Sequence, residues 1–155
     1  MLYIVRHAKA GTRSDWDGDD SARPLTGKGR RQAIAIAERL APLAIGGSLI
    51  SSPAVRCVQT LEPLATLLGV EVVRDLKLAE GAGFDGAVTL LATVPDGSVL
   101  SSHGDVIPDT IAALERRGCV IVGEPDWRKA SVWQLRRTDD GTIHEATAWP
   151  PPQHD

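Results

Sequence analysis

The chain has 155 residues, 43% of them hydrophobic and 24% charged, so it can bury the core of one domain but is short for two. A net charge of -3 argues against a nucleic-acid-binding protein, which usually carries a basic stripe. No apolar run approaches the roughly 20 residues that a membrane-spanning helix needs. We therefore expect one domain over residues 1–149 and a loose tail over residues 150–155.

Two further features favour a cytoplasmic protein. The opening residues, MLYIVRHAKA, contain no basic leader, long apolar stretch or small-residue cleavage site, which argues against a secretory signal. Cys57 and Cys119 lie far apart in apolar contexts, so we expect buried, reduced thiols rather than a disulfide.

Short apolar runs alternate with amphipathic segments along most of the chain. The runs have the length and β-branched content of buried parallel strands; they are residues 2–5 (LYIV), 46–53 (GGSLISSP), 70–75 (VEVVRD) and 97–102 (GSVLSS). Helical patterns lie between them: one after Thr26 with its apolar face over residues 33–44, one over residues 53–68, one over 84–94 and one over 105–118.

The boundaries of these helices carry specific signals. Thr26 is expected to cap the first helix, and Ser52 to cap the second, with Pro53 at its first position and Gly69 just past its end. Near the C-terminus, residues 130–137 (ASVWQLRR) and 142–149 (TIHEATAW) flank the turn TDDGT, which predicts a hairpin. The order implies an α/β three-layer sandwich, with a mostly parallel sheet, an antiparallel edge and helices on both faces.

Polar side chains follow three of the predicted strands. Arg6 and His7 come directly after residues 2–5, Arg56 falls in the first turn of the helix after residues 46–53, and His103 follows residues 97–102. Because the carboxyl ends of parallel strands meet at one edge of a sheet, these four side chains should converge. Two guanidiniums and two imidazoles near the start of a helix suit a phosphoryl group, whose oxygens need many N–H donors.

Four motifs resemble the histidine phosphatase superfamily, whose members have phosphoglycerate mutase-like folds: VRHA (5–8), PLTGKGRRQA (24–33), SSPAVRCVQT (51–60) and SSHGD (101–105). Ala8 stands where the family usually has glycine, as in its short bacterial branch of protein phosphohistidine phosphatases. The resemblance implies that His7 is the nucleophile and forms a phosphohistidine intermediate. It also implies that Arg6, Arg56 and His103 hold the phosphoryl group, with no cofactor.

The group that protonates the leaving group is less clearly marked. The resemblance points to Glu80 in the loop after the third predicted strand, and we favour it over Asp105, which follows His103 by two places. Asp105 has a simpler explanation as the cap of the helix that follows it. Arg23 is expected to be a secondary contact to phosphate or substrate.

A metal site is not expected. The run SDWDGDD at residues 14–20 alternates aspartates like a calcium loop, but Asp20 replaces the required glycine and Thr26 the bidentate glutamate. We interpret it as a solvated acidic loop at the rim of the site, which helps to select substrates. His7 and His103 could bind zinc only beside two arginines, which would repel the ion.

These observations predict a phosphatase that acts through a phosphorylated His7. No room exists for a large cap between the second strand and Glu80, so an open site and a phosphohistidine side chain on a protein are expected first. The alternatives are a small-molecule phosphomonoesterase for a sugar phosphate or nucleotide, and a phosphate-binding module that has lost catalysis. The expected partner is thus a phosphorylated protein or a small phosphorylated metabolite, with no nucleic acid and no membrane.

Overall fold

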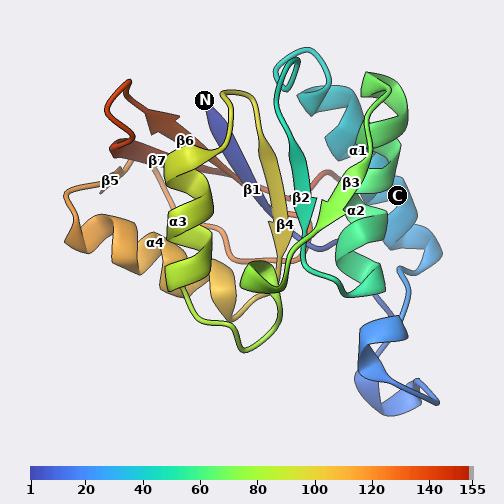
Figure 1. The fold of residues 1–155 in the computed structure, drawn as a ribbon. Helices are drawn as coiled ribbons and strands as arrows, with labels where there is room; N and C mark the ends of the chain where they lie inside the picture. Colours follow the sequence, from blue (N-terminus) through green and yellow to red (C-terminus); the bar gives the residue numbers. More distant parts are fainter. Residues whose placement is uncertain (154–155) are drawn as a thin grey trace.

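A seven-stranded sheet forms the middle layer of the structure, a computed structural model that describes residues 1–153 (Figure 1). The strands lie side by side in the order β3 (Val72–Arg74), β2 (Leu49–Ser51), β4 (Val99–Ser102), β1 (Leu2–Arg6), β6 (Val132–Arg137), β7 (Ile143–Trp149) and β5 (Val120–Ile121). Within residues 1–153, β6 alone runs against the direction of the others. The predicted α/β architecture with a mostly parallel sheet is confirmed.

Helices cover both faces of this sheet (Figure 1). The face against α3 and α4 holds one apolar cluster and the face against α1 and α2 holds another. The four helices are α1 (Gly27–Leu40), α2 (Val55–Leu68), α3 (Asp85–Thr93) and α4 (Val106–Arg116). Short 3-10 helices occupy Arg13–Asp15, Asp20–Ala22 and Leu76–Leu78.

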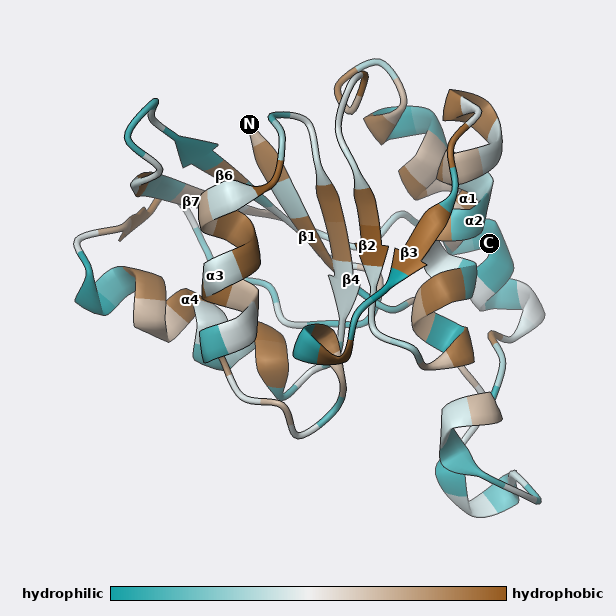
Figure 2. Cartoon of the chain, viewed as in Figure 1, coloured by the Kyte–Doolittle hydropathy of each residue, from teal (hydrophilic) through white to brown (hydrophobic). Residues whose placement is uncertain are grey.

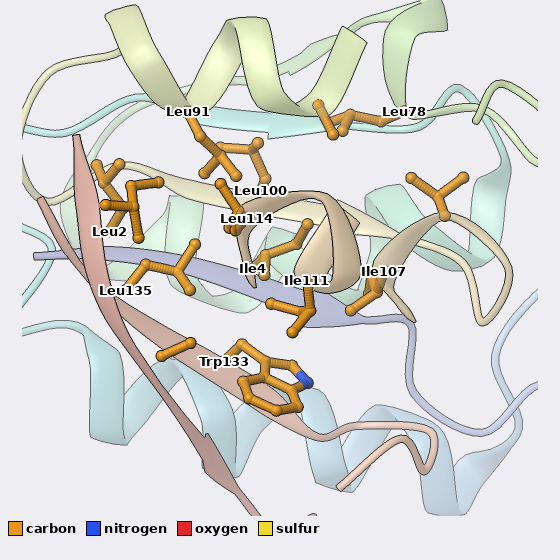
Figure 3. Close-up of a cluster of buried hydrophobic side chains, with 14 of the residues drawn as sticks. Leu2, Ile4, Leu78, Leu91, Leu100, Ile107, Ile111, Leu114, Trp133 and Leu135 are labelled. Atoms are coloured by element: carbon orange, nitrogen blue, oxygen red, sulfur yellow. The ribbon is translucent and has the colours of Figure 1, made fainter. Parts of the chain in front are cut away.

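Strand β1 shows how the sequence builds both cores. Leu2 and Ile4 point to the α3–α4 side, where Figure 3 shows them among Leu100, Ile111 and other buried side chains. Tyr3 and Val5 alternate to the α1–α2 side. All four are at most 1% exposed, and burying each contributes about 1.5–3 kcal/mol. Figure 2 shows the resulting pattern, with brown central strands and a mostly hydrophilic segment over residues 11–24.

Some of the predicted helix boundaries are confirmed and others are wrong. Thr26 caps α1, since its hydroxyl accepts a hydrogen bond from the backbone N–H of Gly29. Gly69 ends α2 in the left-handed conformation, with φ of 68°. Ser52 does not cap α2 and Pro53 is not its first residue, because α2 begins at Val55 after Ala54. The Ser52 hydroxyl lies against His103 instead, at 2.8 Å.

The C-terminal hairpin is confirmed as β6 and β7, but it does not end the sheet. Strand β5, which has only two residues, pairs in parallel with β7 beyond the hairpin. No periodic pattern can reveal so short a strand, because two residues show no alternation. The last two residues of the predicted tail, 154 and 155, lie outside the described residues.

The cysteine prediction is confirmed, because Cys57 and Cys119 are free and buried. Among residues 1–153, no helix combines the length and apolar character that crossing a membrane requires.

The start of α1 is packed tightly against the backbone that follows β1. The backbone N–H of Thr26 donates to the carbonyl of Lys9 at 2.9 Å, and the N–H of Lys9 donates to Oε1 of Gln32 at 3.1 Å. A Cβ atom at Gly29 would collide with the carbonyl oxygen of Lys9, whereas one at Gly27 would have only the end of Arg31 nearby, at 3.5 Å.

We therefore expect Gly29→Ala to lower the free energy of unfolding by about 2–3 kcal/mol, because the backbone of Lys9 would have to move. Gly27→Ala, in the same helical turn, should change it by less than about 1 kcal/mol. Urea unfolding of both variants measures the difference. Equal effects would show that the contact at Gly29 is not what limits this position.

Candidate active site

The carboxyl ends of β1, β4 and β2 point to the same end of the molecule, from which residues 11–24 project (Figure 1). Strands β1 and β4 are aligned so that Arg6 lies opposite Ser102. The residues that follow these two, His7 and His103, therefore lie side by side, with ring centroids 5.6 Å apart. The register of the parallel sheet thus brings together two histidines that are far apart in the sequence.

A cavity of about 430 Å³ lies at this end of the sheet. All of the site residues expected from the sequence line it. Its lining residues are Arg6, His7, Arg13, Arg23, Arg56, Glu80, His103, Gly104, Asp105 and Lys129. Arg13, Gly104 and Lys129 were not anticipated. Gly104 lies within the SSHGD motif, but nothing in the sequence marks Arg13 or Lys129 as a neighbour of His7.

The hydrogen bonding of His7 leaves one ring nitrogen free. Nδ1 lies 2.9 Å from the carbonyl oxygen of Ala8, which can only accept, so Nδ1 carries the proton. Nε2 then keeps its lone pair. Burial lowers the pKa of His7 to about 3, opposed by the Ala8 hydrogen bond and assisted by Arg56, His103 and Arg6. The ring is therefore a neutral nucleophile at neutral pH.

The backbone beside this nucleophile is fixed by α2. The N–H of Ala8 donates to the hydroxyl of Thr60 at 2.9 Å, and that hydroxyl donates to the carbonyl of Arg56 at 2.7 Å. Thr60 ends the SSPAVRCVQT motif, so the motif contributes a positioning side chain as well as Arg56.

His103 is held in the opposite way. Its Nδ1 lies 3.5 Å from Nη2 of Arg56, which can only donate, so Nδ1 is the acceptor. Nε2 then donates to the hydroxyl of Ser52 at 2.8 Å. Burial lowers the pKa of His103 to about 4, with Arg56 acting in the same direction and Glu80 against it. Ser52 is thus a site residue that the sequence presented only as a helix cap.

Arg6 is fixed between two segments. Nη1 donates to the carbonyl of Trp127 at 2.6 Å, and the guanidinium lies where a Cβ atom on residue 104 would be, 2.7 Å from its Cζ. Only glycine at position 104 allows this approach. Nε of Arg6 and Nε of Arg56 are buried, and neither has a hydrogen-bond partner among the described residues. Both guanidiniums line the cavity, where their N–H groups are suited to an anion.

Arg56 is 1% exposed and is neutralised by two carboxylates. Its Nη2 lies 2.9 Å from Oε2 of Glu80 and 3.2 Å from Oδ2 of Asp20, and its Nη1 donates to the carbonyl of Asp20 at 2.9 Å. A buried guanidinium without such partners would be strongly destabilising. Asp20 also pairs with Arg23 at 2.9 Å and with Arg13 at 3.2 Å, so one carboxylate joins three arginines.

The acidic run at residues 14–20 is therefore only partly the solvated loop that was predicted. Its last residue, Asp20, is a structural part of the site, and the arginines beside it hold its pKa below the usual range although desolvation acts against them. The outcome was not visible in the sequence, because neither the spacing nor the order of these residues indicates that Asp20 contacts Arg56.

Glu80 and Asp105 differ in what their carboxylates contact. Oε2 of Glu80 lies 3.9 Å from Nδ1 of His103, and Oε1 accepts from Nη2 of Arg13 at 2.8 Å. Asp105 precedes α4 as expected, but its side chain makes no capping hydrogen bond. Oδ2 of Asp105 accepts instead from the backbone N–H of Gly81 at 2.7 Å. The helix-cap interpretation of Asp105 is therefore wrong, and Asp105 supports the loop that carries Glu80.

The family model for the histidine phosphatase superfamily, branch 1, matches residues 2–87, which is more than half of the chain. The chain belongs to this superfamily. The matched range includes Arg6, His7, Arg56 and Glu80, and ends before His103, so the superfamily match and the geometry of the second histidine are separate observations.

One similar protein is the 8-oxo-(d)GTP phosphatase of Mycolicibacterium smegmatis. It is 34% identical over 157 residues, which cover 97% of this chain and 48% of that protein. The chain thus spans about half the length of this relative.

Two solved structures show the same fold. The protein histidine phosphatase SixA in complex with tungstate has a TM-score of 0.71, with 23% identity over 94% of each chain. A candidate phosphohistidine phosphatase SixA from Nakamurella multipartitia also has a TM-score of 0.71, with 26% identity over 97% of this chain and 95% of its own. The predicted phosphoglycerate mutase-like fold of a histidine phosphatase is confirmed.

In this histidine phosphatase fold, Asp20 should stabilise the free protein and compete with an anion. We expect Asp20→Asn to lower the free energy of unfolding by about 2 kcal/mol, because three arginines lose a shared charge. Inorganic phosphate should raise the melting temperature of Asp20→Asn more than that of the wild type. Asp17→Asn is the matched control from the same loop and should leave both values unchanged, and a phosphate response no larger than that of the wild type would contradict the idea.

The two buried imidazoles should also make the fold sensitive to acid. Both have a folded-state pKa, about 3 for His7 and about 4 for His103, below the unfolded value near 6.5. The unfolded chain therefore binds more protons below pH 6.5, so their contribution is complete above that pH and is lost as pH falls toward 3–4.

At pH 5 this loss should be about 2 kcal/mol for each imidazole. Urea unfolding at pH 7 and pH 5 should accordingly show a fall in stability that is smaller by about 2 kcal/mol in His7→Ala than in the wild type. The contribution of the carboxylates to this fall cancels in the comparison, because they titrate in both proteins. An identical fall in both proteins would mean that His7 is not buried in its neutral form.

Proposed function

We propose that this protein is a phosphatase that transfers a phosphoryl group first to Nε2 of His7 and then to water. We further propose that its substrate is a phosphohistidine side chain on a protein. The observation that carries the proposal is a neutral His7, with its proton held on Nδ1 by Ala8, inside a cavity lined by Arg6, Arg56 and His103.

In the first step, the Nε2 lone pair of His7 attacks phosphorus. The bond from phosphorus to the leaving nitrogen or oxygen breaks, and its electron pair stays with the leaving group. The guanidiniums of Arg6 and Arg56, which line the cavity, stabilise the charge that develops on the phosphoryl oxygens. The Nδ1 proton of His7 stays on its hydrogen bond to Ala8 throughout.

Glu80 is our candidate for the proton donor. Its carboxyl group gives a proton to the leaving group in the first step and becomes a carboxylate. In the second step, water attacks phosphorus and gives one proton back to that carboxylate, while the bond from phosphorus to Nε2 breaks and inorganic phosphate leaves. Glu80 is favoured over Asp105 because its carboxylate lies 3.9 Å from His103, whereas Asp105 is bound to Gly81.

The lining of the cavity supports a protein substrate. Small-molecule sites are usually lined mainly by apolar and aromatic side chains. Among the described residues, this cavity is lined by charged and polar side chains and a glycine, with His7 and His103 as its ring systems. Such a cavity can hold the phosphoryl group while the rest of the substrate lies outside. The P–N bond of phosphohistidine is labile and requires less help from an acid.

The relative from Mycolicibacterium smegmatis favours a second candidate, a nucleoside triphosphate. Its name describes phosphatase action on an oxidised guanine nucleotide, but this chain corresponds to 48% of it. We rank this candidate second because, among residues 1–153, the cavity lining contains no Trp, Tyr or Phe side chain on which a nucleobase could stack.

The nucleophile is tested with three substrates: a phosphohistidine peptide, a chromogenic phosphate ester and a nucleoside triphosphate. We expect turnover of the peptide with the highest kcat/KM, and a loss of at least about 1000-fold in His7→Ala. His144→Ala, which removes an exposed histidine on β7, is the control. Turnover that survives in His7→Ala would refute the intermediate, and a preference for the triphosphate would support the second candidate.

The proton donor is tested with esters of good and poor leaving groups. Glu80→Gln should lower kcat for the poor leaving group by about 100-fold and for the good one by much less. Asp105→Asn should lower both about equally, since it acts only through the loop. The reverse pattern would assign the proton to Asp105.

A further inference from the structure

A second cavity, of about 860 Å³, adjoins the candidate active site. The two cavities share Arg6 and Lys129. Its remaining lining comes from the chain after β1, the first turns of α1, the segment before β6 and the tail: Lys9, Lys28, Gln32, Arg128, Pro150, Pro151, Pro152 and Gln153. We call its four basic residues outside β1, Lys9, Lys28, Arg128 and Lys129, the cationic groove.

The cationic groove concentrates positive charge in an acidic protein. The chain has a net charge of -3 and only four lysines, yet three of them line this one cavity. Within residues 1–153, none of these three lysines forms an ion pair, and no carboxylate lines the cavity. Arg128 alone is paired, with Asp126. The groove is thus set up to attract anions.

The backbone fixes the groove to the catalytic residues. Ala130 has φ of 69°, a left-handed conformation that costs a non-glycine residue about 1 kcal/mol or more. Its N–H donates to the carbonyls of Arg6 and His7, at 3.1 and 3.2 Å. Lys129, the preceding residue, is therefore held at the junction of the two cavities.

Lys129 at this junction forms no ion pair with any carboxylate among residues 1–153. Partial burial lowers the pKa of Lys129, and repulsion from Arg6, Arg23, Lys9 and Arg56 lowers it further. An anion in the groove would relieve this repulsion. The second cavity, which contains the groove, begins at Arg6 beside the position of the phosphoryl group, so such an anion can belong to the same substrate molecule.

We propose that the cationic groove binds acidic side chains that flank the phosphorylated residue of a protein substrate. The inference rests on the proposed protein phosphatase function and adds the sequence preference. Exposed lysines are flexible point charges, which suit carboxylates at variable positions along a peptide. Within the described part of the chain, the remaining lining is three prolines and two glutamines, with no aromatic side chain on which a nucleobase could stack.

The test uses phosphohistidine peptides with acidic, neutral or basic flanking residues. The wild type should prefer the acidic over the neutral peptide by about tenfold in kcat/KM at low ionic strength, mainly through KM. In Lys9→Ala/Lys28→Ala this ratio should fall to about twofold, and added salt should reduce the wild-type ratio in the same way. Lys77→Ala removes the one lysine outside the groove and should keep the wild-type ratio.

Charge reversal separates recognition from loss of structure. Lys9→Glu/Lys28→Glu should prefer the basic peptide over the acidic one, which a merely destabilised protein would not do. Melting temperatures of both double variants check that they fold.

The remaining outcomes distinguish the two proposals. Equal turnover of all three peptides by the wild type would overturn the groove proposal and leave the phosphatase proposal standing. If no phosphohistidine peptide is hydrolysed but a nucleoside triphosphate is, with a KM that rises in Lys9→Ala/Lys28→Ala, both proposals fail and the groove is a polyphosphate site.

Discussion

The burial of the Arg56 guanidinium is the constraint on which the rest of the site depends. The side chain is 1% exposed, and a buried cation of this kind is tolerated only where anions and acceptors surround it. Here the partners are Asp20 and Glu80, which come from two separate loops. The need to neutralise one arginine therefore fixes the position of residues 11–24 and of the loop after β3.

The same constraint explains the state of the histidines. With Arg6 and Arg56 nearby and little solvent, neither His7 nor His103 gains by taking a proton, and the pKa of each falls well below neutrality. The hydrogen bond to Ala8 then decides which nitrogen of His7 is the nucleophile. An arriving phosphoryl group would supply the negative charge that Asp20 and Glu80 now provide, and would free Glu80 for proton transfer.

The distribution of charge outside the site continues this logic. Carboxylates lie on the side of Arg13 and Arg56, whereas the lysines of the cationic groove have no acidic partner among residues 1–153. A substrate that extends from the phosphoryl position thus meets two different surfaces. This unequal distribution of charge arises from the placement of the loops. The net charge of -3 gives no indication of it.

The sequence by itself determined the strands, the helices and the identity of the central site residues. Apolar runs and helical periodicity predicted the mostly parallel sheet, because each strand and helix must bury its own apolar side chains. Since parallel strands end at one edge of a sheet, the sequence alone predicted that four side chains converge there: Arg6, His7, Arg56 and His103.

Only the tertiary structure decided the contacts made between loops. Ser52 and Asp105 each stood where a helix cap is favoured, yet Ser52 contacts His103 and Asp105 contacts Gly81, because long-range partners outweigh a local preference. Arg13 and Asp20 lie in short 3-10 helices and Lys129 in a turn, and none of them carries a periodic signal. Their roles depend on distances between residues far apart in the chain, which local patterns do not encode.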